Sequence, residues 1–255
     1  MSSLRARCPD CRTFTAVAIG SEYECHTCGR QFAAGLVRVP RAWGSGGEAM
    51  AEAAALALPY PEAAVIDEPS LEEQTRACEA VLPKRPVVLG GCCCAHVGAV
   101  RGLGRRFGRL GVVWLDAHGD LNTPETSPSG NLWGMPLRML IDAGAVAAQD
   151  VALVGSRSLD SGEEDFIART GIDDSLDRSL DGVDAAYIAL DADVLDPGEI
   201  MAFMPEPKGP TVADVEATLT DVARRTEVAG IGVTGLVLDA SNLPVVTRLL
   251  AAAGF

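Results

Sequence analysis

The pattern that decides the fold is Gly111-Val112-Val113-Trp114-Leu115-Asp116-Ala117-His118-Gly119-Asp120-Leu121-Asn122. Its first half is apolar and starts at a glycine, which is typical of a strand buried on both faces of a parallel sheet. Its second half carries two carboxylates and an imidazole. Because alternate side chains of an extended backbone share a face, we expect Asp116, His118 and Asp120 to converge. Such a group has the geometry of a site for a divalent metal ion.

A second stretch repeats this arrangement. Residues 184–190 form another largely apolar run, and Asp191 and Asp193 follow it on one face. Acidic side chains after a strand can also be solvated loop residues, and each cluster alone leaves that alternative open. Four carboxylates and a histidine at two strand ends would, however, destabilise the fold if they met without cations. The two clusters together therefore predict a centre that holds two metal ions.

The composition limits the class of protein. The chain has 255 residues, of which 22% are charged and 5% aromatic, and its net charge is −14. This length fits one α/β domain with a small appendage. The acidic balance argues against nucleic acid or an anionic membrane as the main partner. Because the sequence shows neither a membrane-spanning apolar run nor the apolar region of a signal peptide, we expect a cytoplasmic protein.

Four of the eight cysteines form two Cys-x-x-Cys pairs near the N-terminus. Their spacing is that of a zinc ribbon with one structural Zn²⁺, and the four ligands are Cys8, Cys11, Cys25 and Cys28. Redox-active pairs and inert buried thiols are the alternatives. A module of about 30 residues buries little apolar surface, so the zinc would supply its folding energy. Basic residues are few in this module, which favours a structural or subunit-contact role.

We predict a zinc-ribbon module at 1–35, a linker at 36–47 and an α/β domain at 48–255. The linker ends in Gly44-Ser45-Gly46-Gly47, which is typical of a flexible joint. Beyond it, strands are predicted at 86–91, 111–115, 151–155, 184–190 and 228–237, and helices at 48–58, 70–81, 92–100, 136–143, 211–225 and 243–253. This alternation predicts an open three-layer parallel sheet with helices on both faces. Sites in such folds lie at the carboxyl ends of the strands.

Further candidates lie in the loops of this domain. Cys93 belongs to a run of three cysteines at a predicted helix start, where a thiol can serve as a metal ligand or as a small buried apolar group. We favour the ligand role for Cys93, with His96 as the alternative ligand. The loop 122–131 is dense in hydrogen-bonding side chains, which suits a polar substrate but also turn formation. Asp160 is either an acid of the site or a helix cap.

These motifs resemble those of the ureohydrolase family, which comprises arginase, agmatinase and their relatives. The family pattern is Gly-Gly-Asp-His, then Asp-Ala-His-x-Asp, then Ser-Gly-Asn-x-His-Gly-Met-Pro, then Asp-x-Asp-x-x-Asp-Pro. The corresponding segments here are Gly90–Cys93, Asp116–Asp120, Ser129–Pro136 and Asp191–Pro197. The resemblance covers residues 84–242 and leaves out the zinc-ribbon module.

The resemblance implies two Mn²⁺ ions with two bridging ligands and two further ligands for each ion. These ligands are Asp116 and Asp191 as bridges, Cys93 and Asp120 for one ion, and His118 and Asp193 for the other. A hydroxide shared by the ions would attack the amidino or guanidino carbon, and Asp120 would hold or accept its proton. Cys93 stands where the family has a histidine. The thiolate softens that position and leaves Zn²⁺ or Fe²⁺ as alternative occupants.

The resemblance also implies where the substrate binds. Asn122 and Ser129 match residues that contact an amino-acid carboxylate, and Asp160 matches one near the α-amino group. Trp133 stands where arginases carry a histidine thought to shuttle protons, so that catalytic step would differ here. A glutamate that grips the guanidinium group should fall near residue 240, where Asp239 is the substitute that we expect. The expected substrate-binding residues are Asn122, Ser129, Asn131, Asp160 and Asp239.

We therefore predict a dinuclear metal-dependent hydrolase. Its substrate would be a small guanidino or amidino compound resembling an amino acid, cleaved at a linear C–N bond that is not a peptide bond. Because the family forms trimers and hexamers, the resemblance implies a homo-oligomer. The alternative is a metal-binding sensor or scaffold in which the replaced histidine and glutamate mark abandoned catalysis and the zinc ribbon recruits a partner. Neither nucleic acid nor a membrane is expected as a partner.

Overall fold

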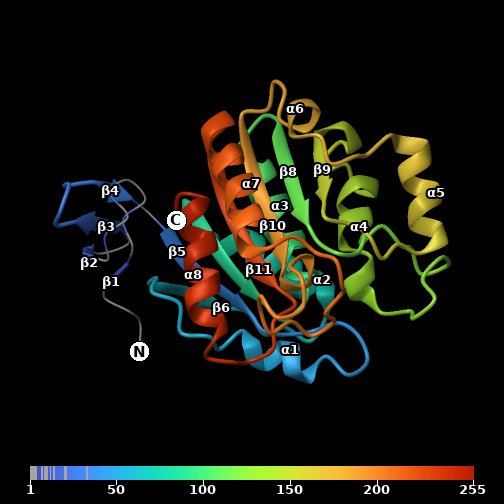
Figure 1. The fold of residues 1–255 in the computed structure, drawn as a ribbon, viewed down its shortest axis with the longest axis horizontal. Coiled ribbons are helices and arrows are strands. Elements are labelled where there is room, and N and C mark those ends of the chain that lie inside the picture. The colour runs from blue at the N-terminus through green and yellow to red at the C-terminus, as the bar shows by residue number, and fades with distance from the viewer. Residues whose placement is uncertain are drawn as a thin grey trace.

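The computed structural model describes residues 5–6, 8, 11, 13, 15–19, 22–32 and 34–255 (Figure 1). Its larger sheet has seven strands, and all of their pairings are parallel. The strands are β5 (Ala34–Val39), β6 (Glu62–Val65), β7 (Arg85–Gly90), β8 (Leu110–Leu115), β9 (Val151–Val154), β10 (Ala185–Asp191) and β11 (Val228–Thr234). Their spatial order is β6-β5-β7-β11-β10-β8-β9. The four central strands, β7, β11, β10 and β8, therefore end side by side.

Helices cover both faces of this sheet, which confirms the predicted three-layer fold (Figure 1). The helices are α1 (Glu48–Ala53), α2 (Leu71–Val81), α3 (Ala95–Gly104), α4 (Pro136–Asp142), α5 (Ser161–Thr170), α6 (Leu176–Ser179), α7 (Val212–Arg225) and α8 (Asn242–Ala252). Residues of α7 and α8 share one buried cluster, and residues of α2, α3, α4 and α5 share another. Within the described ranges, no helix is long and apolar enough to cross a membrane.

Strand β8 is apolar on both faces because the sheet lies between two buried clusters of side chains. Val113 and Leu115 pack with α7 and α8, whereas Val112 and Trp114 pack with α3 and α4. All four side chains are buried, so each stabilises the fold by about 1.5–3 kcal/mol relative to an exposed position. The apolar run of β8 is thus the middle layer of the domain, as its sequence predicts.

Several predicted helix ends agree with the caps in the structure. Ser70 accepts a hydrogen bond from the Glu73 N–H at the start of α2, and Thr211 does the same for the Asp214 N–H at the start of α7. Helix α3 begins at Ala95 instead of residue 92, because the Ala95 N–H bonds to Cys92 O in a tighter turn. Helix α1 ends at Ala53 instead of residue 58. Strand β6 was not predicted, since its short Glu-Ala-Ala-Val sequence lies largely exposed at the sheet edge.

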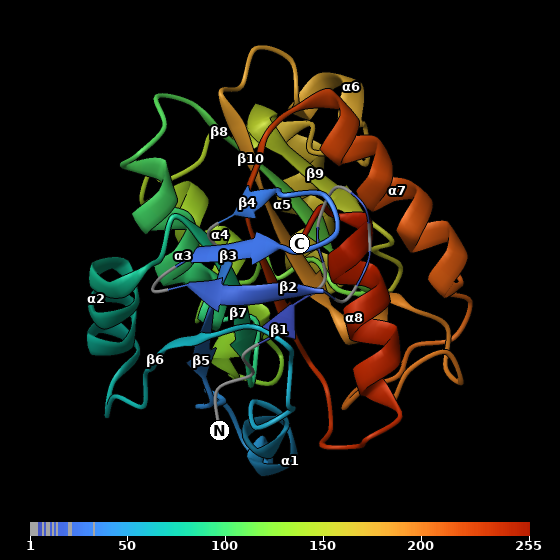
Figure 2. The ribbon, with the colours of Figure 1, turned by 90° about the vertical axis from the view of Figure 1, so that its left-hand side faces the viewer.

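The N-terminal residues form a second, antiparallel sheet from β1 (Arg5–Ala6), β2 (Ala16–Ile19), β3 (Glu22–Cys25) and β4 (Gln31–Phe32) (Figure 2). We call the described residues between 5 and 32 the cysteine module. Part of the predicted segment 1–35 lies outside the described residues. Tyr23 and Cys25 of the module belong to the same buried cluster as Leu36 of β5. The module therefore packs against the amino ends of the larger sheet.

The predicted linker at 36–47 is not a linker over its first part. Residues 36–39 belong to β5, which pairs with both β6 and β7, because Leu36, Val37 and Val39 are apolar and buried. The glycine-rich stretch after β5 is also packed. A Cβ at position 44 would lie 2.3 Å from the Trp133 ring, and the Leu132 N–H donates to Trp43 O. The boundaries of the cysteine module remain a prediction.

This packing makes a substitution at Gly44 informative. We expect Gly44→Ala to lower the free energy of unfolding by about 1–3 kcal/mol, because the added methyl group collides with Trp133. Urea denaturation measures this change. Gly104→Ala is the control, since its Cβ would meet only Ala145 O at 3.5 Å, and as a helical position it should keep or raise the free energy of unfolding, by up to about 1 kcal/mol. Equal stability of the two variants would contradict the close packing of this loop.

Candidate metal centre

The carboxyl ends of the four central strands surround a cavity of about 120 Å³. Its polar side chains come from the segments after β7, β8, β9 and β10, and the sequence places its two acidic clusters after β8 and β10. The predicted metal ligands all line it: Cys93, Asp116, His118, Asp120, Asp191 and Asp193. The topology thus brings together side chains that are up to 100 positions apart in the sequence. This convergence was predicted from the two strand patterns.

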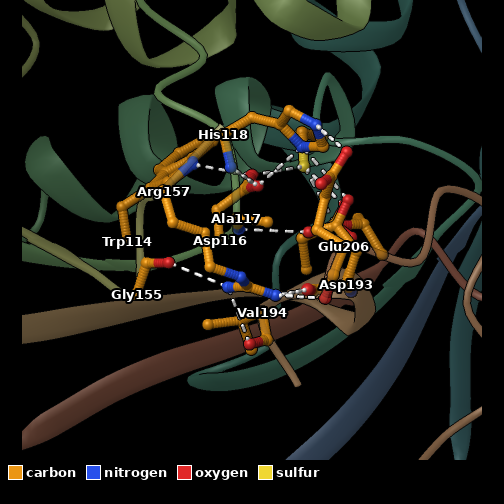
Figure 3. A network of polar contacts seen from close by, with 12 residues as sticks. Trp114, Asp116, Ala117, His118, Gly155, Arg157, Asp193, Val194 and Glu206 are labelled. Carbon is orange, nitrogen blue, oxygen red and sulfur yellow. Dashed lines mark hydrogen bonds and ion pairs between the residues drawn. The ribbon is translucent and has the colours of Figure 1, made fainter. Parts of the chain in front are cut away.

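Asp116 lies at the centre of the polar network drawn in Figure 3 and is 1% exposed. Its Oδ2 accepts a hydrogen bond from Trp114 Nε1 at 3.2 Å, and its Oδ1 accepts one from the His118 N–H at 2.7 Å. Burial raises the pKa of this carboxyl group. Two donors from its own strand end therefore fix the orientation of Asp116 toward the cavity.

Asp191 and Asp193 are fixed in a similar way at the end of β10. Asp191 Oδ1 accepts a hydrogen bond from the Asp193 N–H at 3.1 Å, and Asp193 Oδ1 accepts one from the Ala117 N–H at 3.1 Å. The second contact ties the ends of β8 and β10 together (Figure 3). Burial raises the pKa of both aspartates to about 6. Their charged forms therefore need compensation by a cation.

The His118 ring lies between two of these carboxylates. Its Nδ1 is 3.4 Å from Asp116 Oδ1 and 3.2 Å from Asp193 Oδ2, and its Nε2 is 3.8 Å from Glu206 Oε1 (Figure 3). Burial alone would lower the pKa of His118, but the hydrogen bonds to Asp116 and Asp193 outweigh it and raise this pKa to about 12. Without metal, a proton on His118 thus provides the positive charge that a metal ion would otherwise bring.

Asp120 has an unusual backbone and an unsatisfied side chain. Its φ angle is 53°, in the left-handed region, and its buried Oδ2 has no hydrogen-bond partner. Burial, followed by the charge of Asp116, raises the pKa of Asp120 well above its ordinary value. A buried carboxylate oxygen without a donor costs free energy unless a cation or a ligand meets it. Asp120 is therefore the clearest sign that the cavity binds a cation.

The donor atoms fit two neighbouring divalent ions. One group consists of Cys93, Asp116 and Asp120, and the other of Asp116, His118 and Asp193, with the ligand atoms of each group within 4.8 Å of one another. Asp116 belongs to both groups, as a bridging ligand would. Carboxylate, imidazole and thiolate groups together suit first-row transition metals. The residues present therefore fit a dinuclear metal centre.

His96, the alternative ligand, does not face the carboxylates. It is fully buried, with Nδ1 2.9 Å from the Tyr187 hydroxyl and Nε2 3.2 Å from Thr234 Oγ1. Burial lowers the pKa of His96 to about 3, so the ring is neutral. Cys93 Sγ instead lies 2.9 Å from Asp191 Oδ2. Of the two candidates, only Cys93 reaches the cavity.

Three of the five expected substrate residues line the cavity: Asn122, Ser129 and Asp160. Asn122 Nδ2 donates to Asp160 Oδ2 at 2.8 Å. Asp160 also precedes α5, where its N–H donates to Glu163 Oε2, so it serves both as a cap residue and as part of the cavity wall. The sequence left these two roles open, and the structure gives Asp160 both.

The other two expected substrate residues lie outside the cavity lining. Asn131 Oδ1 accepts a hydrogen bond from the Ser45 N–H, because the glycine-rich loop packs onto residues 131–133. Asp239 accepts hydrogen bonds from the N–H and the hydroxyl of Ser241, in the turn before α8. Neither side chain is positioned to touch a ligand in the cavity. The expectation that they bind the substrate directly is therefore not supported by their positions.

Trp133 does line the cavity and forms part of an apolar wall with Met50 and Phe203. Its ring meets the Phe203 ring edge to face, with centroids 6.1 Å apart. An indole has no group that titrates near neutral pH, so Trp133 cannot shuttle a proton. The structure gives it the role of an apolar wall instead.

Two structurally important residues were missed at the sequence level. The Arg157 guanidinium donates to the carbonyls of Gly155, Asp193, Val194, Glu206 and Pro207, and thereby fastens the loop of residues 204–207 to the end of β10 (Figure 3). Glu163 is 2% exposed, and its Oε1 accepts the Leu121 N–H. Both residues bind backbone groups, which leave no trace in the sequence pattern.

The four cysteines of the N-terminal module also converge. Cys8 Sγ is 3.5 Å from Cys28 Sγ, Cys11 Sγ is 3.5 Å from Cys25 Sγ, and all four sulfur atoms lie within 4.8 Å of one another. A hydrogen bond to the Thr15 hydroxyl lowers the pKa of Cys25 to about 5, which favours the thiolate. Four sulfurs at this spacing suit a tetrahedral zinc ion.

The chain is similar to known proteins over most of the α/β domain. The model of the family described as "Arginase family" matches residues 45–237. The arginase of Staphylococcus aureus (strain COL) is 37% identical over 142 residues, which cover 45% of this chain and 47% of that protein. The chain thus spans about half the length of the curated relatives that it matches.

Solved structures show the same fold. The arginase of Bacillus subtilis superposes with a TM-score of 0.75 at 23% identity, over 86% of this chain and 97% of that chain. The native arginase of Bacillus caldovelox superposes with a TM-score of 0.72 at 25% identity, over 87% of this chain and 97% of that chain. From the extent of the family match and the agreement of the fold, we conclude that this chain belongs to the arginase family.

Proposed function

We propose that the protein is a dinuclear metal-dependent hydrolase of the ureohydrolase type. It would cleave a linear C–N bond in a small guanidino or amidino compound that resembles an amino acid. The observation that carries this proposal is the convergence of buried carboxylates, one imidazole and one thiol on a cavity at the carboxyl ends of the strands. Membership of the arginase family supports the reaction class.

We assign the ligands as two sets around two ions. Asp116 and Asp191 would belong to both sets, Cys93 and Asp120 would complete one, and His118 and Asp193 would complete the other. When bound, two divalent cations, Mn²⁺ in the first instance, supply Lewis acidity and an activated water at neutral pH. The protein contributes ligands whose orientation is fixed by backbone N–H groups and by Trp114.

The remaining residues of the cavity hold the substrate and move protons. The free Oδ2 of Asp120 is placed to accept a proton from the attacking water. Asp160, held by Asn122, offers a carboxylate to a cationic amino group, and the Ser129 hydroxyl is available to a carboxylate group of the substrate. Trp133 and Phe203 exclude water from one side of the cavity.

We propose further that the cysteine module holds one structural Zn²⁺ through Cys8, Cys11, Cys25 and Cys28. The module is small, so its fold depends on the metal. We also expect a homo-oligomer, a trimer or a hexamer, which light scattering would measure on the purified protein.

A second function, a metal-binding sensor or scaffold, is favoured by one observation. Asp239 lies outside the cavity lining, so the carboxylate expected to grip a guanidinium group is missing. In this case the centre would bind metal without turnover, and the cysteine module would recruit a protein partner. Asp120 would be a metal ligand in either function, so turnover and not metal binding separates the enzyme from the sensor.

Assays of urea and ammonia release distinguish the two functions. We expect the Mn²⁺-loaded protein to hydrolyse at least one compound of a panel of guanidino and amidino amino acids. Asp120→Asn should lower kcat by roughly 100-fold or more, because the amide cannot accept a proton. Asp174→Asn, at an exposed position, should leave kcat unchanged. Inactivity toward the whole panel, with metal content confirmed by element analysis, would exclude the enzyme and leave the sensor.

A further inference from the structure

The thiol of Cys93 distinguishes one half of the metal centre from the other. We propose that the position formed by Cys93, Asp116 and Asp120 selects a thiophilic divalent ion such as Zn²⁺, whereas the position formed by Asp116, His118 and Asp193 retains Mn²⁺. The centre would then hold two different metals. This inference rests on the proposed function, because it refines the metal centre on which that function depends.

The position of Cys93 Sγ is that of a metal ligand. It lies 2.9 Å from Asp191 Oδ2 and 3.6 Å from Asp116 Oδ2, and the side chain is buried. In a tetrahedral site with a metal–sulfur distance of about 2.3 Å and a metal–oxygen distance of about 2.1 Å, sulfur and oxygen ligands lie about 3.6 Å apart. The distance from Cys93 Sγ to Asp116 Oδ2 is thus the spacing that one shared ion would impose, whereas the shorter contact with Asp191 is a hydrogen bond from the thiol to the carboxylate.

The neighbouring cysteines do not share this position. Cys92 Sγ accepts a hydrogen bond from the Trp43 N–H and approaches Arg41 O, on the side of the loop that follows β5. Cys94 packs with Cys92 and Met50 in a small apolar cluster. Cys93 is therefore the one member of the three-cysteine run whose sulfur contacts the acidic ligands.

A chain of hydrogen bonds orients the thiol. Thr234 Oγ1 lies 3.2 Å from Cys93 Sγ, and His96 Nε2 lies 3.2 Å from the same Thr234 oxygen. The other nitrogen of His96 is bound to the Tyr187 hydroxyl. Partners of this kind fix the orientation of a ligand and tune the metal that it binds. His96 is thus a positioning residue that acts on Cys93 through Thr234.

The ligand types give the two positions different preferences. A thiolate is soft and favours Zn²⁺ or Fe²⁺, while a set of carboxylates and one imidazole remains suitable for Mn²⁺. Because Asp116 belongs to both sets, the two ions are held side by side with unlike ligands. The Cys93 side chain alone would make the two positions differ in their affinity for Zn²⁺ and Mn²⁺. Substitution of Cys93 therefore tests this difference.

Cobalt is the probe that reports on the thiolate directly. Protein with an emptied centre and one equivalent of zinc in the cysteine module is titrated with Co²⁺, and the near-ultraviolet charge-transfer band from thiolate to cobalt is recorded. We expect the band to reach its maximum at the first equivalent and not to grow with the second. A 100-fold excess of Mn²⁺ should displace the second cobalt ion and leave the band in place.

Variants assign the band to Cys93. Cys93→Ser should bind cobalt without the band, and Cys93→His should allow excess Mn²⁺ to displace both cobalt ions. Cys78→Ser is the matched control, because Cys78 is equally buried but lies in α2, and it should give the wild-type spectrum. If a Cys93 variant does not fold, the cobalt titration of the wild-type protein and its competition with Mn²⁺ are sufficient to test the proposal.

The outcomes separate this inference from the proposed function. Two cobalt ions bound without a band, or a band that appears only with the second equivalent, would overturn the selective thiolate position while the dinuclear centre stands. Displacement of the band by excess Mn²⁺ would overturn it as well. Absence of any cobalt binding beyond the cysteine module would overturn the metal centre and with it the proposed hydrolase.

Discussion

Replacement of Asp116 by alanine is expected to remove both ions of the cavity and to leave the zinc of the cysteine module in place. Among the described residues, Asp116 belongs to both of the three-residue ligand groups of the cavity. Its loss deprives both ions of a ligand at once, so the fall in activity should exceed the roughly 10–100-fold cost of losing a group that only supports a ligand. Element analysis by mass spectrometry should show one zinc per chain, against one zinc and about two further divalent ions in the wild type.

A reciprocal variant makes this result specific. Cys25→Ser should lose the zinc and retain the two ions of the cavity, because Cys25 Sγ lies in the cysteine module and belongs to a separate ligand group. Asp174→Ala is the control for an aspartate at an exposed position and should retain all three ions. If Asp116→Ala still held two ions beyond the zinc, Asp116 would not be a bridging ligand.

Removal of the metal ions is expected to destabilise the protein more at pH 7.5 than at pH 5. In the metal-free protein, burial raises the pKa of Asp191 and Asp193 to about 6, whereas the unfolded chain has an ordinary value near ~3.9. The folded state therefore binds protons that the unfolded state has released. Its stability is greatest below pH ~4 as far as these groups are concerned and falls until both have ionised, above pH ~6.

The titration of His118 also lowers the stability of the metal-free protein as the pH rises, but over a higher pH range. Its pKa in the folded, metal-free protein is about 12, above the value of ~6.5 in the unfolded chain. The stability that its proton contributes is complete below pH ~6.5 and is lost as the pH rises toward 12. Metal ions replace these protons, so the metal-loaded protein should depend less on pH in this range.

The size of the effect follows from these pKa values. As the pH rises from 5 to above 6, each aspartate releases its proton in the folded state, and the stabilisation that this proton provides falls by about 1.4 kcal/mol. His118 loses about one further unit, about 1.4 kcal/mol, between pH ~6.5 and pH 7.5. The gap in unfolding free energy between metal-loaded and metal-free protein should thus widen by roughly 4 kcal/mol between pH 5 and pH 7.5. Urea denaturation at both pH values measures it. In Asp116→Ala, which cannot hold the ions, the pH-dependent gap should vanish, and a gap that persisted there would assign the effect to the zinc instead.

The sequence predicted the central strands and their acidic ends for a physical reason. A strand buried on both faces must be apolar along its whole length, and this run is visible in residues 111–115 and 184–190. The carboxylates that follow are conspicuous as two clusters, because acidic groups that are buried together are costly unless cations compensate their charge. The aspartates and the histidine that line the cavity, which we propose as metal ligands, could therefore be named from the sequence.

Other features could not be predicted, because they depend on contacts with the backbone or with distant loops. Arg157 donates hydrogen bonds to five backbone carbonyl groups, and no sequence pattern predicts contacts of this kind. The stretch Gly44–Gly47 suggested a flexible joint, whereas its glycines allow close packing on Trp133. Counting along the family pattern placed the expected carboxylate near residue 240, with Asp239 as its substitute, yet the turn before α8 directs the Asp239 carboxylate to Ser241.

Strand β5 has a consequence for how the two ends of the molecule are related. It leaves the cysteine module at Ala34, and after Val39 it continues into the loop that touches Trp133. Because β5 is hydrogen-bonded to a neighbour along each edge, it cannot slide or swing without breaking a ladder. The cysteine module is thus connected to the sheet through a rigid strand, at the end of the sheet opposite the cavity. A protein bound to the module would therefore keep a fixed orientation relative to the sheet, at the end opposite the cavity.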